Sequence, residues 1–366
     1  MGWPFHIAVV GAGPAGSVAA REAARWGRGS VLLLDRSEFP RPKTCAGGLS
    51  ARSCRLLKEL KLWKRVRPDG YPISSVRVVL PGGDALLVPA AGAALVVDRE
   101  RFDHALVRAA IEDGVEFRPR TKVDRLLWAD GRVVGVEAGA LRIRARWTII
   151  ATGADNMLHK AARAEQLTHT CVARFEGVSI APHICDFVYD SELFPYYGWL
   201  FPESDTRANV GICAGAARLR GRSIRDVFAH FLDRHYGASL KRAKQIGRLR
   251  GAAIATGDRL THSAPPGVLL AGEADRLANV ATGEGISYAM ESGRLAARAI
   301  RSADESGLGP AQAGRLYAAS LRRVLALRFR AAWAYRKIGV PVLNVASALP
   351  CRGTLARLVG RALSLI

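Results

Sequence analysis

The sequence predicts an α/β fold built on a buried parallel sheet, and three features near its start support this prediction. Residues 6–10 form a short, nearly continuous apolar run, which is typical of a buried parallel strand. A glycine-rich turn over residues 11–16 follows directly, and apolar residues at helical spacing predict a helix over about residues 14–26. Residues 31–34 form a second apolar run. We therefore expect a strand, a turn, a helix and a second, parallel strand.

The spacing of the glycines in this turn is typical of a dinucleotide-binding, Rossmann-like unit. Gly11 permits the tight turn, Gly13 removes a side chain where a pyrophosphate approaches, and Gly16 lets the helix pack against the strand. The helix then points its N-terminal N–H groups at the phosphates. Asp35 follows the second strand, where its carboxylate can accept hydrogen bonds from a ribose. A glycine-rich turn without a ligand is the alternative, and the surrounding strand, helix and acid disfavour it.

The composition is that of a globular protein with a large positive charge. The chain has 366 residues, and 49% of them are hydrophobic, which is enough for a full core. Its net charge of +22 fits a nucleic-acid partner, an anionic membrane surface or a basic solvated surface. The arginines are spread without a long basic run, which argues against nucleic acid.

Cysteine spacing and the chain start predict a cytoplasmic protein. The six cysteines form no CxxC pair and no metal-ligand spacing with the histidines, so we expect reduced thiols and no metal site. The first strand begins near residue 6, which leaves no room for a signal peptide. The longest apolar stretches are interrupted or fall short of the roughly 20 residues that cross a bilayer.

The rest of the chain divides into a mixed region and a strand-rich region. In the first region, strands are predicted at residues 75–80, 85–88, 96–97, 115–117, 123–128, 133–136, 141–145 and 147–151. From about residue 171 alternation replaces the helical period, and strands are predicted at residues 171–175, 187–189, 198–201, 209–214 and 268–271. Helices are predicted after the capping residue Ser50 and over residues 98–113, 223–236 and about 282–300.

The C-terminal segment is basic, with no acidic residue after Glu305. Its cations alternate with apolar residues; they are Arg315, Arg322, Arg323, Arg328, Arg330, Arg336, Lys337, Arg352, Arg357 and Arg361. This pattern favours amphipathic helices that lie on anionic lipid at the inner face of a membrane. A lid that packs on the core with a solvated basic face is the alternative. Gly307 and Gly309 follow no apolar strand, so we interpret them as an interhelical loop.

Taken together, these motifs resemble FAD-dependent enzymes of the para-hydroxybenzoate hydroxylase and glutathione reductase type, and within them the geranylgeranyl reductase family. The resemblance is carried by residues 11–16 with Asp35, and by residues 39–50, 98–103, 153–155, 197–202 and 272–285. It implies a Rossmann-like FAD-binding domain, an inserted mixed β-sheet substrate domain and a C-terminal helical segment. Their expected bounds are 1–70, 99–156 and 262–305 for FAD binding, 71–98 and 157–261 for substrate, and 306–366 for the basic amphipathic segment.

The resemblance implies a set of FAD contacts along the first domain. Gly11, Gly13 and Gly16 would hold the pyrophosphate, Asp35 the ribose, and Arg99 the flavin side of the phosphates. The full set comprises Gly11, Gly13, Pro14, Ala15, Gly16, Asp35, Arg36, Cys45, Ala46, Gly47, Arg99, Val123, Gly153, Asp155, Gly272, Glu273, Gly283, Gly285 and Ile286.

The chain departs from the family pattern in the flavin region. Glu273 stands where the family has an aspartate, and Arg276 and Val280 stand where a glycine and a proline are expected. Asn156 replaces a glycine, a milder change because asparagine tolerates positive φ. The resemblance therefore implies either a reshaped flavin site or a divergent branch with another substrate.

By the same resemblance, reduced flavin delivers hydride to an isolated C=C bond of a polyprenyl chain that lies in an apolar tunnel. NAD(P)H or a reduced ferredoxin is expected as external electron donor. Tyr197, Trp199 and Phe201 are candidates for the tunnel wall, with ordinary sheet core as the alternative. Cys45 is the candidate proton donor or flavin-tuning group, with a buried inert thiol as the alternative.

Two other functions remain open. A flavin monooxygenase would use oxygen to hydroxylate an aromatic or protein-bound substrate, and a halogenase would need a Trp-x-Trp-x-Ile-Pro segment. Residues 198–202 hold only one tryptophan, which disfavours halogenation. A non-catalytic flavin-binding protein is the third hypothesis, supported by Glu273 and Arg276.

Overall fold

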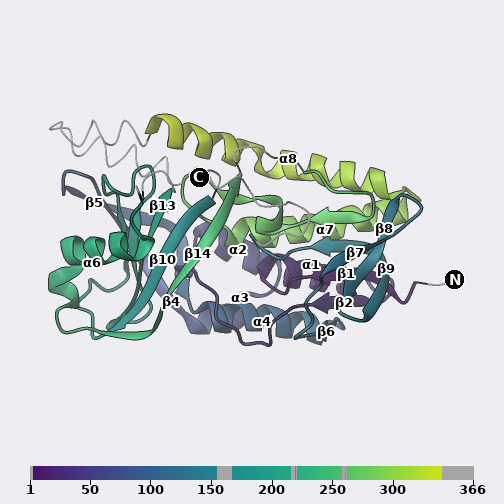
Figure 1. The fold of residues 1–366 in the computed structure, drawn as a ribbon, viewed down its shortest axis with the longest axis horizontal. Helices are drawn as coiled ribbons and strands as arrows, with labels where there is room; N and C mark the ends of the chain where they lie inside the picture. Colours follow the sequence, from purple (N-terminus) through teal and green to yellow (C-terminus); the bar gives the residue numbers. More distant parts are fainter. Residues whose placement is uncertain are drawn as a thin grey trace.

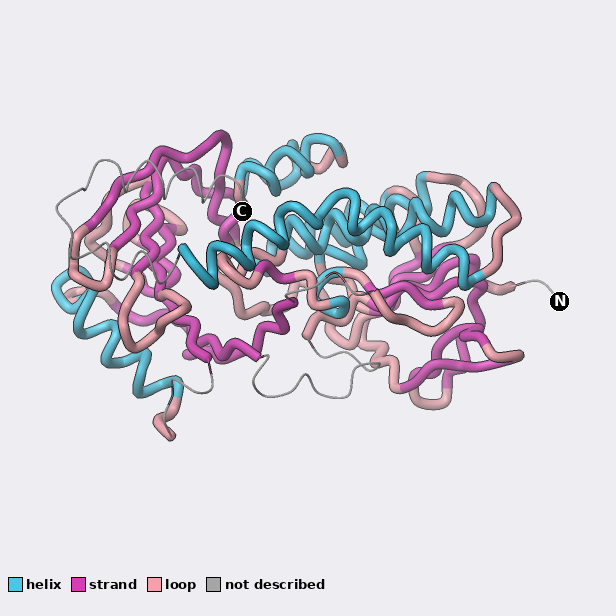
Figure 2. Tube along the Cα trace, turned by 90° about the horizontal axis from the view of Figure 1, so that it is seen from above, coloured by secondary structure: helices cyan, strands magenta, loops and turns pink. Residues whose placement is uncertain are grey.

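The computed structural model describes residues 3–154, 167–215, 219, 221–257, 260 and 262–339. The predicted α/β fold is confirmed. Two sheets lie along the long axis of the molecule, one near the N-terminus and one towards the other end (Figure 1). Seen from above, strands occupy both ends and the long helices run between them (Figure 2).

The first sheet contains the predicted parallel unit. Its order is β6-β2-β1-β9, with β15 beside β9, and Ile7 of β1 lies between Val31 and Trp147. These strands are β1 (Phe5–Val10), β2 (Val31–Leu34), β6 (Glu116–Arg118), β9 (Leu141–Ile150) and β15 (Val268–Leu270). Two antiparallel strands, β7 (Arg125–Ala129) and β8 (Arg132–Ala138), extend it from the first half of β9.

The helices are α1 (Pro14–Arg25), α2 (Ala51–Glu59), α3 (Trp63–Val66), η1 (Arg67–Asp69), α4 (Arg99–Glu112), η3 (Gly272–Asp275), α7 (Ile286–Glu305) and α8 (Pro310–Ala334), with a π-helical turn η4 (Tyr335–Gly339) at the end. Of these, α1, α4 and α8 contact strands of the first sheet. The Ser50 side chain accepts from Ser53 N, and the Asp98 side chain accepts from Glu100 N. Because both oxygens satisfy orphan N–H groups, α2 and α4 begin where the capping residues predict.

The second sheet is larger and mixed. Its order is β16-β14-β10-β13-β12-β11-β4-β5-β3. The strands are β3 (Gly48–Leu49), β4 (Gly70–Val79), β5 (Ala85–Val97), β10 (Leu167–Glu176), β11 (Ile184–Val188), β12 (Gly198–Pro202), β13 (Arg207–Gly215), β14 (Lys244–Gly257) and β16 (Ala278–Asn279). Helix α6 (Ile224–Leu240) packs on β10 and β13. We propose that the two sheets mark the FAD-binding and substrate domains.

Several strands differ from the sequence prediction, including the two-residue strands β3 and β16, which were not predicted. Residues 85–88 and 96–97 belong to one strand, β5, which pairs with β4 across a register shift between Ile73 and Ser75. Residues 141–145 and 147–151 also form one strand, because β9 pairs with β8 through its first half and with β1 through its second. β14 was not predicted, since its residues are mostly basic, small or half-exposed and lack a clear alternation. Its hydrogen bonds to β10 define it instead.

The inner face of α8 belongs to the main core. Its buried residues recur at helical spacing and are Ala313, Tyr317, Leu321, Leu325, Phe329 and Ala332. The Tyr317 hydroxyl donates to the carbonyl of Leu270 at 2.7 Å, which fixes α8 to β15. Gly307 and Gly309 lie in the short connection between α7 and α8, as expected.

Helix α7 packs on α1 through a glycine, and this contact yields a stability prediction. A Cβ atom at Gly293 would lie 2.1 Å from the carbonyl oxygen of Ala15. We expect Gly293→Ala to lower the free energy of unfolding by about 1–3 kcal/mol, because backbone cannot move away as a flexible side chain would. Urea unfolding followed by circular dichroism measures this change in the free energy of unfolding.

Gly314 provides the matched control, because it lies in helix α8 and a Cβ there meets no atom within 4 Å. Gly314→Ala should stabilise the protein by up to about 1 kcal/mol through helix propensity. Equal effects of the two substitutions would contradict the close packing of α1 and α7.

Candidate functional site

A cavity of about 820 Å³ lies between the two sheets. Residues at the carboxyl ends of four parallel strands border it: Val10, Leu34, Ala151 and Ala271. The segment over residues 36–52, which includes β3 and the start of α2, forms one side, and the start of α7 forms another. Strands of the second sheet form an apolar wall. Ligands bind at the carboxyl ends of strands in open α/β sheets, so this cavity is the candidate site.

The glycine-rich turn brings backbone to the cavity surface. Gly11 has φ +99°, and a Cβ there would lie 2.4 Å from the carbonyl oxygen of Ala151. A Cβ at Gly13 would lie 3.7 Å from a guanidinium nitrogen of Arg41. Helix α1 starts at Pro14 with no side chain bonded to its first N–H groups. These donors and the Arg41 cation fit the pyrophosphate of a dinucleotide.

Gly16 is needed for close packing and does not line the cavity. A Cβ atom there would lie 1.8 Å from the carbonyl oxygen of Gly11, so only glycine lets α1 leave the turn at this angle. Gly47 and Gly272 also lie outside the lining. Both have positive φ, and a Cβ at Gly47 would lie 2.2 Å from the carbonyl oxygen of Val97.

Asp35 lies at the end of β2, at the cavity surface. One carboxylate oxygen accepts from Ala12 N at 2.8 Å, and the other accepts from Ser37 N at 2.8 Å. Arg41 Nε lies 3.9 Å from Asp35, and its guanidinium stacks 4.7 Å from the centre of the Phe39 ring. Asp35 is thus held rigidly beside the turn, where a ribose of a dinucleotide fits.

Arg99 connects α4 to the loop over residues 36–47, which carries Cys45 and is called the cysteine loop below. Its guanidinium donates to both oxygens of Asp103, at 2.8 and 2.9 Å, inside the protein. Burial alone would lower the pKa of Arg99, but the Asp103 carboxylate outweighs burial and raises that pKa. The Cys45 thiol lies beside the same guanidinium, and its sulfur accepts from Gly47 N at 3.4 Å.

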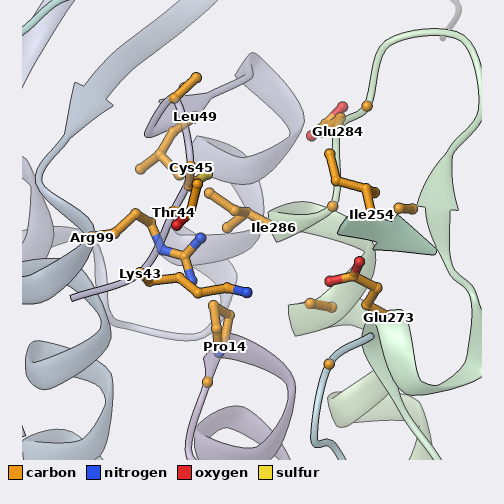
Figure 3. A pocket seen from close by; sticks show the side chains of 18 of the residues that line it. Pro14, Lys43, Thr44, Cys45, Leu49, Arg99, Ile254, Glu273, Glu284 and Ile286 are labelled. Atoms are coloured by element: carbon orange, nitrogen blue, oxygen red, sulfur yellow. The ribbon is translucent and has the colours of Figure 1, made fainter. Parts of the chain in front are cut away.

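Lys43 and Glu273 point toward one another across the cavity (Figure 3). One Glu273 oxygen accepts from Ala255 N of β14 at 2.8 Å, so this residue joins η3 to the second sheet. Burial raises the pKa of Glu273, against the opposing effect of Lys43. Arg276 has φ +54°, which explains why a glycine is expected there. Val280 is buried among the apolar residues of the second sheet.

The start of α7 faces the cavity from the opposite side. Gly283, Glu284, Gly285 and Ile286 line it, and no side chain caps the helix. Glu284 accepts hydrogen bonds from the hydroxyls of Ser50 at 2.6 Å and Ser53 at 3.3 Å. Backbone N–H groups and the positive end of the helix dipole therefore remain available to a ligand.

Aromatic side chains of the second sheet form the apolar wall. Tyr197, Trp199 and Phe201 all line the cavity and are at least nine-tenths buried. The Tyr197 hydroxyl donates to the carbonyl of Thr282, and burial raises the pKa of Tyr197 well above its usual value.

A hydrogen-bond chain joins this wall to the cysteine loop. Trp199 Nε1 donates to Asn209 Oδ1 at 3.0 Å, and Asn209 Nδ2 donates to the carbonyl of Cys45 at 3.1 Å. Asn209 is 3% exposed. Satisfied buried bonds of this kind hold the loop in one position.

The structure brings most of the predicted site residues together. Those that line the cavity are Gly11, Gly13, Pro14, Ala15, Asp35, Arg36, Cys45, Ala46, Arg99, Val123, Gly153, Tyr197, Trp199, Glu273, Gly283, Gly285 and Ile286. Asp155 and Asn156 lie outside the described residues.

The side chains of the site that were not predicted include Arg41, Lys43 and Asn209. Arg41 and Lys43 belong to the same proline-rich loop as Cys45, and two cations in a loop that follows a dinucleotide-binding acid are a signal that could have identified them. Asn209 gives no local signal, because its partners are far away in the sequence.

Comparison with known proteins agrees with this geometry. The FAD binding domain family matches residues 5–209. A digeranylgeranylglycerophospholipid reductase of Methanopyrus kandleri is 32% identical over 315 residues, covering 82% of this chain and 78% of that protein. A menaquinone reductase of Mycolicibacterium smegmatis is 30% identical over 328 residues, covering 81% and 76%.

Solved structures share the fold. A geranylgeranyl bacteriochlorophyll reductase-like protein from Thermoplasma acidophilum has a TM-score of 0.82 at 22% identity, covering 99% of both chains. A flavin-dependent brominase has a TM-score of 0.77 at 21% identity, covering 97% and 93%. The match to the FAD binding domain family and the sequence relatives together show that the chain belongs to the geranylgeranyl reductase family of FAD-dependent oxidoreductases.

Proposed function

We propose that this protein reduces C=C bonds of a polyprenyl chain with FAD as its cofactor. The observation that carries the proposal is one continuous cavity in which the glycine-rich turn and the α7 start face an aromatic wall. The relatives named as reductases of geranylgeranyl lipids and of menaquinone support a polyprenyl substrate. FAD bound there would supply hydride to the alkene.

The turn and its neighbours act as the cofactor cradle in this proposal. The N–H groups at the start of α1 and the Arg41 guanidinium bind the pyrophosphate, and Asp35 binds the ribose. Arg99 is kept in place by Asp103. The start of α7 presents the positive end of its dipole to the flavin ring.

In this proposal Cys45 donates the proton that the alkene needs. Reduction of an alkene needs a proton at the carbon that does not receive hydride, and the Cys45 sulfur lies on the cavity surface beside the aromatic wall. The Asn209 bond to the Cys45 carbonyl positions the thiol. Tyr197 and Trp199 exclude water and orient the chain, which is what an uncharged alkene requires of a site.

Two further proposals concern partners. An external donor, NAD(P)H or a reduced ferredoxin, supplies the electrons. The outer face of α8 lies on an anionic membrane, which gives access to lipid substrates. That face exposes Leu316, Val324, Leu327 and Trp333 among arginines. Within the described residues, no helix is long and apolar enough to span a bilayer.

The central test is anaerobic. The purified protein should bind FAD and turn yellow. After reduction, geranylgeranyl lipids or menaquinone should reoxidise the flavin without oxygen and yield a product two mass units heavier per reduced bond. Cys45→Ala should slow this reoxidation by about 10²-fold or more, as expected for loss of a general acid.

Oxygen-dependent turnover of an aromatic substrate, with no anaerobic reaction, would instead support the monooxygenase alternative. A flavin that no donor can reduce would support a non-catalytic role.

Glu273 gives a pH prediction for the apoprotein. Its pKa is raised on folding, so its contribution to stability is full below the usual glutamate value of about 4.3 and is lost as pH rises through the folded pKa. Glu273→Gln retains an oxygen for Ala255 N. We therefore expect this variant to be more stable than the wild type at pH 8, with a difference that shrinks towards pH 5, measured by urea unfolding.

The control is Glu38→Gln, which removes a carboxylate that is 65% exposed. It should show no such trend. If the Glu273→Gln variant were less stable than the wild type at every pH, burial would not be destabilising the Glu273 carboxylate.

Membrane contact is tested with matched tryptophans. Trp333 of α8 is 47% exposed and Trp128 of β7 is 57% exposed. We expect Trp333→Ala to weaken co-sedimentation with phosphatidylglycerol-containing vesicles several-fold, and Trp128→Ala to leave it unchanged. Binding that is equal on purely zwitterionic vesicles would contradict the role of the arginines.

A further inference from the structure

The cavity reaches the surface at two places that differ in chemistry. Near Asp35 its exposed lining residues carry charge and include Arg36 and Lys122. On strand β5 its exposed lining residues are Pro89 and Gly92. The first opening lies beside the proposed nucleotide site, so the second, apolar opening is the one that suits an uncharged chain.

A wide bulge in β5 forms the rim of the second opening. The ladder between β4 and β5 shifts register between Ile73 and Ser75, so residues 90–93 of β5 stand opposite a single residue of β4. Gly92 in this bulge has φ +133°, and a Cβ atom there would lie 3.5 Å from the Cβ of Ala51, the first residue of α2. The opening therefore lies where the β5 bulge meets α2.

The exposed part of β5 around this bulge is apolar. Residues 85–94 contain no polar or charged side chain. Leu87 is 58% exposed, and Ala93 is also exposed. Within the described part of the chain, β3 pairs with β5 at Leu95 and Leu49 and at the next residue pair, and the rest of β5 is an edge of the second sheet. An apolar edge of this kind is favoured only when a partner covers it.

The edge is poorly suited to pairing with another strand. Pro89 has no N–H group to donate to a ladder, and the bulge over residues 90–93 interrupts the register. A lipid surface, in contrast, requires no ladder of hydrogen bonds. The edge is also continuous with the cavity, because Val88 and Ala90 line it and so does Arg328 of α8. Thus β5 and α8 border the same cavity.

We propose that residues 87–93 of β5 rest on the lipid bilayer at head-group level, and that the polyprenyl chain passes over the bulge into the cavity. This proposal rests on the proposed function, because only a lipid substrate needs an entrance that avoids water. It adds a second membrane contact to the outer face of α8, and it places the two contacts on elements that both border the cavity.

The first test measures membrane binding. We expect Leu87→Asp to weaken co-sedimentation with phosphatidylglycerol-containing vesicles about fivefold or more, because it removes apolar contact area and adds repulsion from anionic lipid. Leu141→Asp is the matched control, since Leu141 of β9 is 53% exposed and lies outside the cavity lining. It should bind vesicles like the wild type. Equal binding by the Leu87→Asp protein and the wild type would overturn the proposal.

The second test measures entry of the chain. We expect Ala93→Asp to raise KM for geranylgeraniol embedded in vesicles about fivefold or more, and to leave KM for geraniol dissolved in buffer unchanged. The shorter alcohol reaches the cavity through water, so the bilayer contact does not affect it. An equal rise for both alcohols would show that the bulge shapes the site itself, and would overturn the proposed entrance.

Vesicle binding separates this proposal from the proposed function, because it requires no turnover. If the FAD-loaded protein bound vesicles through Leu87 but reduced no polyprenyl compound, the bilayer contact would stand and the reductase function alone would be refuted. If Leu87→Asp instead converted a dimer to a monomer in size-exclusion chromatography and left vesicle binding unchanged, a second copy of the chain would cover this edge and the bilayer contact would be refuted.

Discussion

The close approach of α1 to its surroundings is the constraint on which the structure depends. At Gly16 and Gly293, backbone atoms of the turn and of α1 occupy the space that a Cβ would need. These contacts pack α1 against β1 and β9, and α7 against α1. Both helices therefore begin at the cavity, so two sets of backbone N–H groups face the same space.

The second sheet completes the site because a few polar contacts tie it to the first. Glu273 accepts from Ala255, and Asn209 donates to the Cys45 carbonyl. The cofactor cradle and the apolar wall are thereby fixed relative to one another. A hydride can reach a chosen alkene carbon only when both are held within a fraction of an ångström, so these links matter more for chemistry than for stability.

The sequence was most informative where one backbone geometry requires particular residues. Gly11, Gly13 and Asp35 were predicted as dinucleotide contacts from a local turn pattern, and all three do line the cavity. Ser50 and Asp98 located helix starts for the same local reason. β14 was missed because its pairing with β10, and not its own pattern, makes it a strand. Arg41 and Asn209 were missed because their roles arise from partners distant in the chain, which no single sequence displays.

The link from Trp199 through Asn209 to the cysteine loop has a consequence for how the family diversifies. Trp199 cannot be exchanged freely, because the change would release Asn209 and with it the Cys45 carbonyl, as well as reshape the wall. Ile73, Val76 and Val88 border the same cavity with purely aliphatic side chains. Evolution can enlarge or narrow the chain path at these three positions at little cost, so related enzymes that accept different lipids should diverge there while the tryptophan and its amide partner persist.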